Sequence, residues 1–330
     1  MRWLFILLLL TCCTENGQNN TRSWMQKNNK IKVLGTIGMI SDLVQDIGGD
    51  NVDVLTLIPP GLDPHSYQLV KGDDEKFAFA DLIFYNGLGL EHGPSLLQTL
   101  NHSPKAIPIG DLIQRKLPSQ ILTYDGQPDP HIWTDISLWS QAVPIIVRAL
   151  SDHDPENQIE YTKRGQELIE KMENTHKKVR DQLQKIPDQY RFLVTSHDAF
   201  NYFTRAYLAT EEEQANSWQK RFVAPEGLSP ESQLSTTDIQ DTLRHILQFD
   251  IFVIFPESNV SQASLRKLQD SASQMGLTLK ISTQPLYGDA MGPAGSNADT
   301  YLKMIEANAN TLSEQLHAME NANGKRNNSF

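Results

Sequence analysis

Three histidines and one aspartate are the residues of this chain best suited to chemistry. The tripeptide Asp-Pro-His occurs twice and supplies His65 and His131, while His197 follows a strand-like segment and Asp289 ends the turn Leu-Tyr-Gly-Asp. Imidazole nitrogens and a carboxylate oxygen form a ligand set that borderline transition-metal ions accept. The four residues together predict a metal site.

Each of these residues, taken alone, has an ordinary structural interpretation as a turn former or a helix cap. The repeated tripeptide, and the presence of all four residues in loops after strand-like segments, favour the metal site over coincidence. The aspartates that precede the first two histidines, Asp63 and Asp129, are interpreted as residues that fix their loops rather than as ligands.

Six further histidines lie outside the predicted ligand set. They occur on predicted helices or in polar loops, and they are His92, His102, His153, His176, His245 and His317. Among them His92 also follows a strand end, in the sequence Leu-Glu-His. The chain contains neither His-Glu-x-x-His nor Gly-x-Ser-x-Gly, so the usual patterns of zinc proteases and serine hydrolases are absent.

The elements that must position these residues alternate between strands and helices. In the first half, strands are expected at 31–37, 52–58, 82–85 and 106–109, and helices at 39–47, 73–80, 93–100 and 136–150. In the second half, strands are expected at 192–195, 251–255 and 277–281, helices at 236–249, 261–275 and 299–316, and a polar loop at 211–232. This alternation predicts βαβ units and mostly parallel sheets, whose functional loops follow the carboxyl ends of the strands.

A long helix is expected between the two halves, at residues 155–186, where apolar residues recur mainly at threes and fours. It would measure roughly 45 Å, more than one domain needs for its own packing. We therefore predict an α/β protein of two similar lobes joined by one long helix. The expected segments are an export signal at 1–13, a flexible tether at 14–30, lobes at 31–152 and 189–318, a linking helix at 153–188 and a polar tail at 319–330.

The start of the chain predicts export from the cytoplasm. Arg2 precedes an apolar run at 4–10 that is too short to span a membrane, and Cys12 and Cys13 follow it. We expect a periplasmic or cell-envelope protein that is lipid-anchored through one of these cysteines, with simple cleavage or an uncleaved anchor as alternatives. The rest of the chain has no cysteine, which excludes disulfides. The formal net charge of -11 argues against a nucleic-acid partner.

Six motifs, spread over residues 31–316, resemble the metal receptors of bacterial ABC importers, known as solute-binding protein family 9, and in particular their TroA-type branch. The motifs are Thr-Ile-Gly-Met-Ile at 36–40, Asp-Pro-His-Ser-Tyr at 63–67, Ala-Asp-Leu-Ile-Phe-Tyr-Asn-Gly-Leu at 80–88, Asp-Pro-His-Ile-Trp at 129–133, Thr-Ser-His-Asp-Ala-Phe at 195–200 and Asp-Ala-Met-Gly at 289–292.

The resemblance implies a metal ion held in the cleft between the lobes, with little hinge motion on binding. His65 and His131 would come from the first lobe, and His197 and Asp289 from the second. It also implies delivery of the ion to a membrane permease driven by a cytoplasmic ATPase. The protein would act as a monomer and would catalyse nothing.

The identity of the metal stays open, with zinc and manganese favoured and iron allowed. Residues 114–127 lack the histidines of many zinc-dedicated relatives, and His197 stands where manganese-dedicated relatives often have glutamate. A metal-dependent hydrolase with Asp198 or Glu257 as general base is the main alternative, and an adhesin is a third interpretation. A cage of four protein ligands favours carriage, because it leaves no position for a reactive water. Binding should weaken below about pH 6, where imidazoles take up protons.

Overall fold

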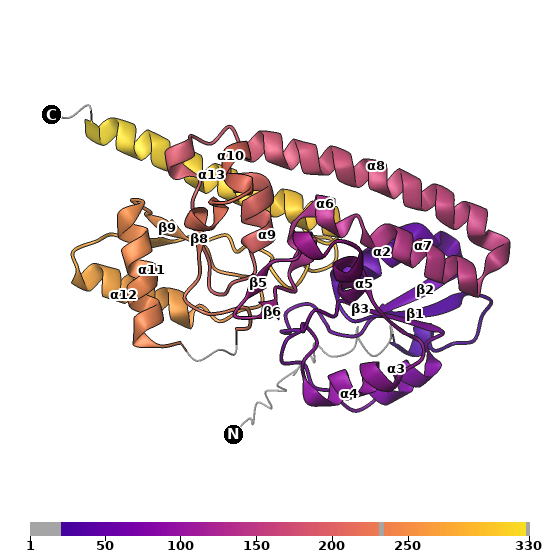
Figure 1. The fold of residues 1–330 in the computed structure, drawn as a ribbon. Helices are drawn as coiled ribbons and strands as arrows, with labels where there is room; N and C mark the ends of the chain where they lie inside the picture. Colours follow the sequence, from indigo (N-terminus) through magenta and orange to yellow (C-terminus); the bar gives the residue numbers. More distant parts are fainter. Residues whose placement is uncertain (1–20, 231–233, 328–330) are drawn as a thin grey trace, which may run out of the picture.

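The computed structural model describes residues 21–230 and 234–327, and it has two α/β lobes. In Figure 1 the first lobe is drawn in indigo and purple and the second mainly in orange. The long helix α8 (Gln158–Leu183) runs along one side of both lobes. The predicted architecture of two lobes joined by a long helix is confirmed.

The first lobe is built on a parallel sheet in the order β2-β1-β3-β4. Its strands are β1 (Ile31–Gly35), β2 (Val52–Thr56), β3 (Leu82–Tyr85) and β4 (Ala106–Pro108). Every residue of β1 is buried, as expected of an apolar central strand covered on both faces. The helices are α2 (Gly38–Gly48), α3 (Asp73–Phe79), α4 (Pro94–His102), α5 (Ile109–Lys116), α6 (Ile136–Trp139) and α7 (Ala142–His153), and a short antiparallel pair joins β5 (Thr123–Tyr124) to β6 (Gln127–Pro128).

The single helix expected at 136–150 is wrong, because the structure divides it into α6 and α7. The side chain of Asp135 caps α6 by accepting a hydrogen bond from the backbone N–H of Ser137 at 2.9 Å. Pro144 lies in the first turn of α7. Proline has no N–H to donate, so it is tolerated in a first turn but would break a continuous helix. The break therefore follows from Pro144.

The linking helix α8 packs closely against the first lobe. A Cβ atom at Gly165 would lie 2.6 Å from Cγ2 of Val147, so only glycine lets α7 approach this closely. The guanidinium of Arg164 donates to the carbonyls of Ile47 and Gly48 at 2.6 and 3.0 Å, which satisfies the end of α2. Helix α8 is about 39 Å long at 1.5 Å per residue.

Helix α13 (Tyr301–Asn327), the last helix of the chain, lies beside α8. Lys178 and Gln182 of α8 contact Glu306 and Asn310 of α13 at 2.8 and 2.9 Å. The helix was expected to end at 316, but its backbone remains helical through much of the segment predicted as a polar tail.

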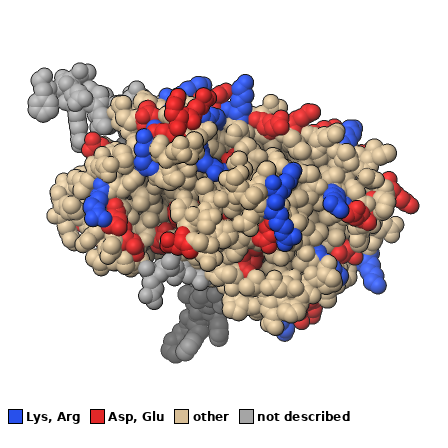
Figure 2. Space-filling view, in the orientation of Figure 1, with Lys and Arg blue, Asp and Glu red and all other residues tan. Residues whose placement is uncertain are grey.

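On the face shown in Figure 2, acidic and basic side chains are interspersed.

The second lobe contains two short parallel strand pairs. β7 (Leu193–Val194) pairs with β8 (Phe222–Val223), and β9 (Val253–Ile254) pairs with β10 (Lys280–Ile281). A backbone hydrogen bond of 2.8 Å from Phe255 to Val194 links the two pairs. The helices are α9 (Asn201–Phe203), continued by a π-helical turn at Thr204–Leu208, α11 (Thr236–Gln248) and α12 (Ala263–Gln274). The parallel pairing is confirmed, although the strands are shorter than expected.

Residues 211–230, the described part of the predicted polar loop at 211–232, are more structured than that prediction. They include α10 (Glu211–Gln214), a 3-10 turn at Trp218–Arg221 and strand β8. The side chain of Arg221 is buried and binds the carboxylates of Glu213 and Asp188. This ion-pair network, composed of Arg221, Glu213 and Asp188, gives the segment a structural role that its composition did not reveal.

The flexible tether expected at 14–30 is wrong for its second half. Trp24 is 5% exposed, its indole N–H donates to the carbonyl of Asp53 at 2.9 Å, and its ring centroid lies 5.6 Å from that of Phe79. Residues 21–30 are therefore anchored to the first lobe.

Cys12, Cys13 and the predicted export signal lie outside the described residues. Among the helices that the structure describes, none is long and apolar enough to cross a membrane.

Candidate metal centre

The structure brings all four predicted ligands together between the lobes. The ligand atoms of His65, His131, His197 and Asp289 lie within 4.8 Å of one another, and all four residues are buried. The first two come from the first lobe and the last two from the second. We refer to these four side chains as the cage.

The spacing inside the cage suits one ion. Nε2 of His131 lies 3.2 Å from Nε2 of His65 and 3.4 Å from Oδ1 of Asp289. Oδ2 of Asp289 lies 3.1 Å from Nε2 of His197 and 3.7 Å from Nε2 of His65. Ligands of a tetrahedral ion with bonds of about 2.05 Å stand roughly 3.3 Å apart. These four separations are of the size expected between ligands of one ion, and all the ligand atoms lie within 4.8 Å of one another.

The two aspartates of the Asp-Pro-His motifs fix their loops, as predicted. Oδ1 of Asp63 accepts the backbone N–H of His65 at 2.9 Å. Oδ1 of Asp129 accepts both the backbone N–H of His131 at 2.9 Å and its ring Nδ1–H at 2.7 Å. The second contact turns Nε2 of His131 toward the cage, which is how carboxylates commonly orient metal-binding histidines.

Glu257 plays the corresponding part in the second lobe. Its Oε1 accepts the backbone N–H groups of Ser196 and His197 at 3.1 and 2.9 Å, and its Oε2 lies 2.8 Å from Nδ1 of His197. The sequence suggested Glu257 only as a general base in the hydrolase alternative. One signal in the sequence was available: Glu257 comes just after the predicted strand at 251–255. The expectation that functional residues follow the ends of strands also located the cage residues.

Asp289 is a buried carboxylate whose polar neighbours are the cage histidines. It is 3% exposed, and its oxygens lie 3.1 Å from Nε2 of His197, 3.4 Å from Nε2 of His131 and 3.7 Å from Nε2 of His65. Burying such a group is costly unless it is paired. A cation between Asp289 and the three imidazoles would compensate its charge, so the residues present fit a metal ion.

Hydrogen bonds between the lobes surround the cage. The indole N–H of Trp133 donates to the carbonyl of Gly288 at 2.8 Å, and the hydroxyl of Tyr301 donates to the carbonyl of Trp133 at 2.7 Å. The hydroxyl of Tyr202 donates to the carbonyl of Asp129 at 3.0 Å. These three interlobe bonds hold the backbone next to two of the cage residues.

Burial and charge shift the pKa values of the cage in different directions. Burial lowers the pKa of His65 well below its usual value and favours the neutral ring that binds metal. Burial also acts to lower the pKa of His197, but the carboxylates of Glu257 and Asp289 outweigh it and raise that pKa well above its usual value. Burial acts to raise the pKa of Asp289, but the neighbouring histidines outweigh it and lower the pKa.

A Glu257→Gln variant is expected to bind metal about 10- to 100-fold more weakly, because it loses the carboxylate that orients His197. Isothermal titration with zinc would measure the change. Glu170→Gln, on the exposed surface of α8, is the matched control and should bind like the unmodified protein. Unchanged affinity in Glu257→Gln would show that Glu257 does not support the cage.

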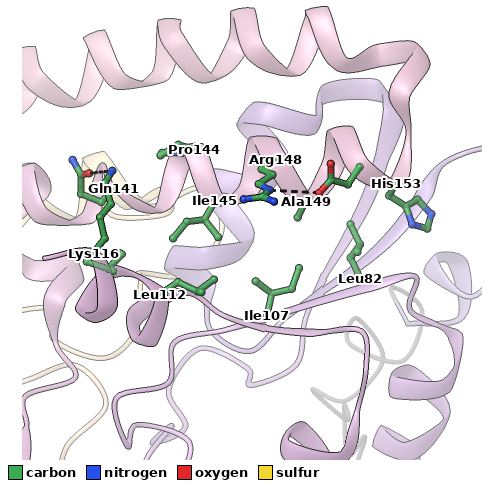
Figure 3. Close-up of a pocket in the computed structure, with 12 residues that line it drawn as sticks. Leu82, Ile107, Leu112, Lys116, Gln141, Pro144, Ile145, Arg148, Ala149 and His153 are labelled. Carbon is green, nitrogen blue, oxygen red and sulfur yellow. Dashed lines mark hydrogen bonds and ion pairs between the residues drawn. The ribbon is translucent and has the colours of Figure 1, made fainter. Parts of the chain in front are cut away.

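The large groove of the first lobe does not contain the cage. Figure 3 shows a groove of about 780 Å³ between α7 and the segment that carries β4 and α5. Leu112, Ile145 and other apolar side chains line it, and no cage residue is among its lining residues. The metal centre is a closed set of buried atoms rather than an open groove.

Comparisons with known proteins agree with this geometry. The sequence profile described as "Zinc-uptake complex component A periplasmic" matches residues 33–315. The metal-binding protein YtgA of Chlamydia trachomatis serovar D is 37% identical over 312 residues, covering 94% of each chain. The zinc-binding protein TroA of Treponema pallidum is 33% identical, covering 85% of this chain and 87% of its own.

Solved structures show the same fold. The Fe(III)-bound YtgA from Chlamydia trachomatis superposes with a TM-score of 0.81 at 38% identity, covering 87% of this chain and 98% of that one. The periplasmic zinc-binding TroA from Treponema pallidum superposes with a TM-score of 0.77 at 33% identity, covering 87% and 99%. The profile match spans most of the chain and includes all four cage residues, so this protein belongs to the family of the periplasmic zinc-uptake complex component A.

Proposed function

We propose that this protein is the extracytoplasmic substrate-binding component of an ABC importer for a divalent transition metal. It binds the ion with His65, His131, His197 and Asp289 and delivers it to a membrane permease powered by an ATPase. The convergence of these four buried ligand atoms within 4.8 Å carries the proposal. The protein works as a single chain and catalyses no reaction.

The ligand set supports zinc or manganese as the cargo, with iron as a further candidate. Three nitrogens and one oxygen complete a tetrahedral zinc site. Both oxygens of Asp289 face cage histidines, at 3.4 Å from His131 and 3.1 Å from His197. Bidentate binding by Asp289 would raise the ligand number to five, which suits manganese or iron better than four does. Relatives named for zinc and for Fe(III) are consistent with this range.

We further propose that the protein is held at the cell envelope by a lipid on Cys12 or Cys13. The manganese-binding lipoprotein MntA of Bacillus subtilis is 31% identical over 315 residues, covering 95% of this chain and 97% of its own, which supports this placement. The two lobes, at 31–152 and 189–318, would then stand outside the membrane on a short linker that precedes Trp24.

The hydrolase alternative has less support. Burial raises the pKa of Asp198 to about 7, which would suit a general base. However, four protein ligands leave no open position for a metal-bound water. Glu257, the other candidate base, is engaged through both oxygens by the backbone and ring of the His197 segment.

Metal content and coordination test the proposed function. The protein purified from its own cell envelope should contain about one transition-metal ion per chain by elemental analysis. X-ray absorption should show three nitrogen ligands and one carboxylate, with no water. A water ligand together with turnover of an ester or phosphodiester would instead favour the hydrolase, and absence of stoichiometric metal would contradict both.

A further inference from the structure

Asn201 is a buried polar residue of the second lobe whose side chain contacts the first. It begins helix α9 and is 3% exposed. Its side-chain Nδ2 donates a hydrogen bond to Oδ2 of Asp129 at 3.0 Å. A carboxylate can only accept, so this contact fixes which end of the amide faces Asp129. The bond therefore joins a side chain of the second lobe to the residue that orients His131.

The same amide is also bonded to the ligand loop of its own lobe. Nδ2 of Asn201 donates a second hydrogen bond, to the backbone carbonyl of Asp198 at 3.2 Å. Asp198 directly follows the cage residue His197. An amide nitrogen carries two hydrogens, so it can make both bonds at once. One side chain thus bridges the loop of His197 in the second lobe and the loop of His131 in the first.

The carboxylate of Asp129 gains a second contact from this bridge. Its Oδ1 accepts the backbone N–H and the ring Nδ1–H of His131 at 2.9 and 2.7 Å. The torsion that turns a carboxylate about its Cβ–Cγ bond is broad, so the rotamer of Asp129 does not by itself set the plane of the group. Asn201 holds the other oxygen. With both oxygens held, the plane of the carboxylate is fixed, and with it the direction in which Nε2 of His131 points.

Asn201 lies in a closely packed segment. The aromatic side chains of Phe200, Tyr202 and Phe203 beside it are all 0% exposed. The hydroxyl of Tyr202 donates to the backbone carbonyl of Asp129 at 3.0 Å. Two consecutive residues of the second lobe therefore hold Asp129, one through its carboxylate and the other through its backbone.

We propose that Asn201 is a positioning residue for the metal ligand His131, and that it acts from the opposite lobe through the carboxylate of Asp129. While the lobes are in contact, the amide of Asn201 completes the orientation of His131. If the lobes separate at the cage, Asp129 loses this partner and His131 loses its fixed direction. This inference rests on the proposed metal-binding function, and it adds a residue outside the cage to it.

An Asn201→Asp variant tests the hydrogen bond without changing the shape of the side chain. It replaces the donor by an oxygen that faces the oxygen of Asp129, so we expect zinc to bind about tenfold more weakly. Isothermal titration with a competing chelator would measure Kd. A side chain that only fills space would tolerate this change, so normal zinc binding in Asn201→Asp would overturn the proposal.

An exchange of the two side chains tests whether Asn201 acts through Asp129. Asp129→Asn alone should bind zinc weakly, because one of its amide ends meets either the amide of Asn201 or the ring N–H of His131 with a second donor. Combined with Asn201→Asp, the amide at position 129 can accept from His131 and donate to the carboxylate at position 201. We expect this double variant to bind zinc about tenfold more tightly than Asp129→Asn. Equal or weaker binding would contradict the proposal.

Asn157→Asp is the matched control. Nδ2 of Asn157 donates to Oδ2 of Asp154 at 2.7 Å, which is the same kind of bond, just before helix α8. This variant should bind zinc like the unmodified protein, and an equal loss of affinity in it would overturn the proposal.

Thermal unfolding of the metal-free proteins should show that all variants remain folded. If Asn201→Asp does not fold, Asn201→Ala removes the same bond without adding a charge, and it should lose affinity by a similar factor. Failure of the unmodified protein to bind zinc at all would instead contradict the proposed function, so the two failures are distinguishable.

Discussion

A His197→Ala variant is expected to bind zinc at least about a hundredfold more weakly than the unmodified protein. His197 is fully buried and is oriented by Glu257, and its Nε2 lies 3.1 Å from Asp289. Its removal leaves three ligands and an enlarged site that water can enter. Isothermal titration, with a competing chelator to reach tight affinities, would measure the loss.

Two further variants sharpen this test. His153→Ala removes an exposed histidine at the end of α7 and should leave affinity unchanged. Asp289→Asn keeps the shape of the cage but removes the charge that compensates the ion, so it should also bind weakly. If His197→Ala and Asp289→Asn both bound zinc normally, the ion would have to be held elsewhere and the proposed ligand set would be wrong.

An Arg221→Met variant is expected to lower the free energy of unfolding by about 3 to 5 kcal/mol. Arg221 is 1% exposed and binds Glu213 and Asp188, so methionine would leave the carboxylate of Glu213 in a largely buried position without its main partner. Urea denaturation of the metal-free protein would measure the change.

Arg244→Met serves as the control for Arg221→Met. Arg244 pairs with Asp241 on the surface of α11, where their side chains are 74% and 53% exposed. Such exposed pairs contribute little to stability, so this variant should unfold like the unmodified protein. Equal effects of the two substitutions would mean that the buried ion-pair network has no special stabilising role.

The same network predicts a pH dependence. Burial acts to raise the pKa of Glu213, but hydrogen bonds from Arg221 and Lys220 outweigh it and lower the pKa to about 2. Because the folded pKa lies below the ordinary value of 4.5, the stabilisation is complete above about pH 4.5 and is lost as the pH falls toward 2. Glu213→Gln should remove this part of the acid sensitivity in urea denaturation at several pH values.

The sequence located the cage because its signals are local. His65 and His197 lie in the loops after the parallel strands β2 and β7, and the carboxyl ends of parallel strands meet where an open α/β sheet binds its ligands. His131 instead follows the antiparallel strand β6. The repeated motif and the prolines beside His65 and His131 are visible in the sequence itself. The fold class and the linking helix were predictable for the same reason, since they depend on periodicity along the chain.

Features that depend on contacts between distant segments were missed. Glu257 meets His197 across 60 residues of sequence, and no pattern near either residue indicates the pairing. Arg221 likewise reaches Asp188, 33 residues away, so the segment at 211–232 resembled a polar loop. The division of the helix expected at 136–150 could have been predicted from the sequence. Pro144 lies inside that segment, and a proline indicates a break in a continuous helix.

The three interlobe bonds made by Trp133, Tyr301 and Tyr202 have a consequence for how long the cargo is retained. These hydrogen bonds lie at the same interface between the lobes as the metal ligands. The lobes therefore cannot separate at the cage unless the three bonds break as well. At about 1 kcal/mol each, they make spontaneous opening rarer by roughly a hundredfold. The metal-loaded receptor would therefore lose its ion slowly before it meets its permease. Release of the ion would require the docked transporter to separate the lobes at this interface.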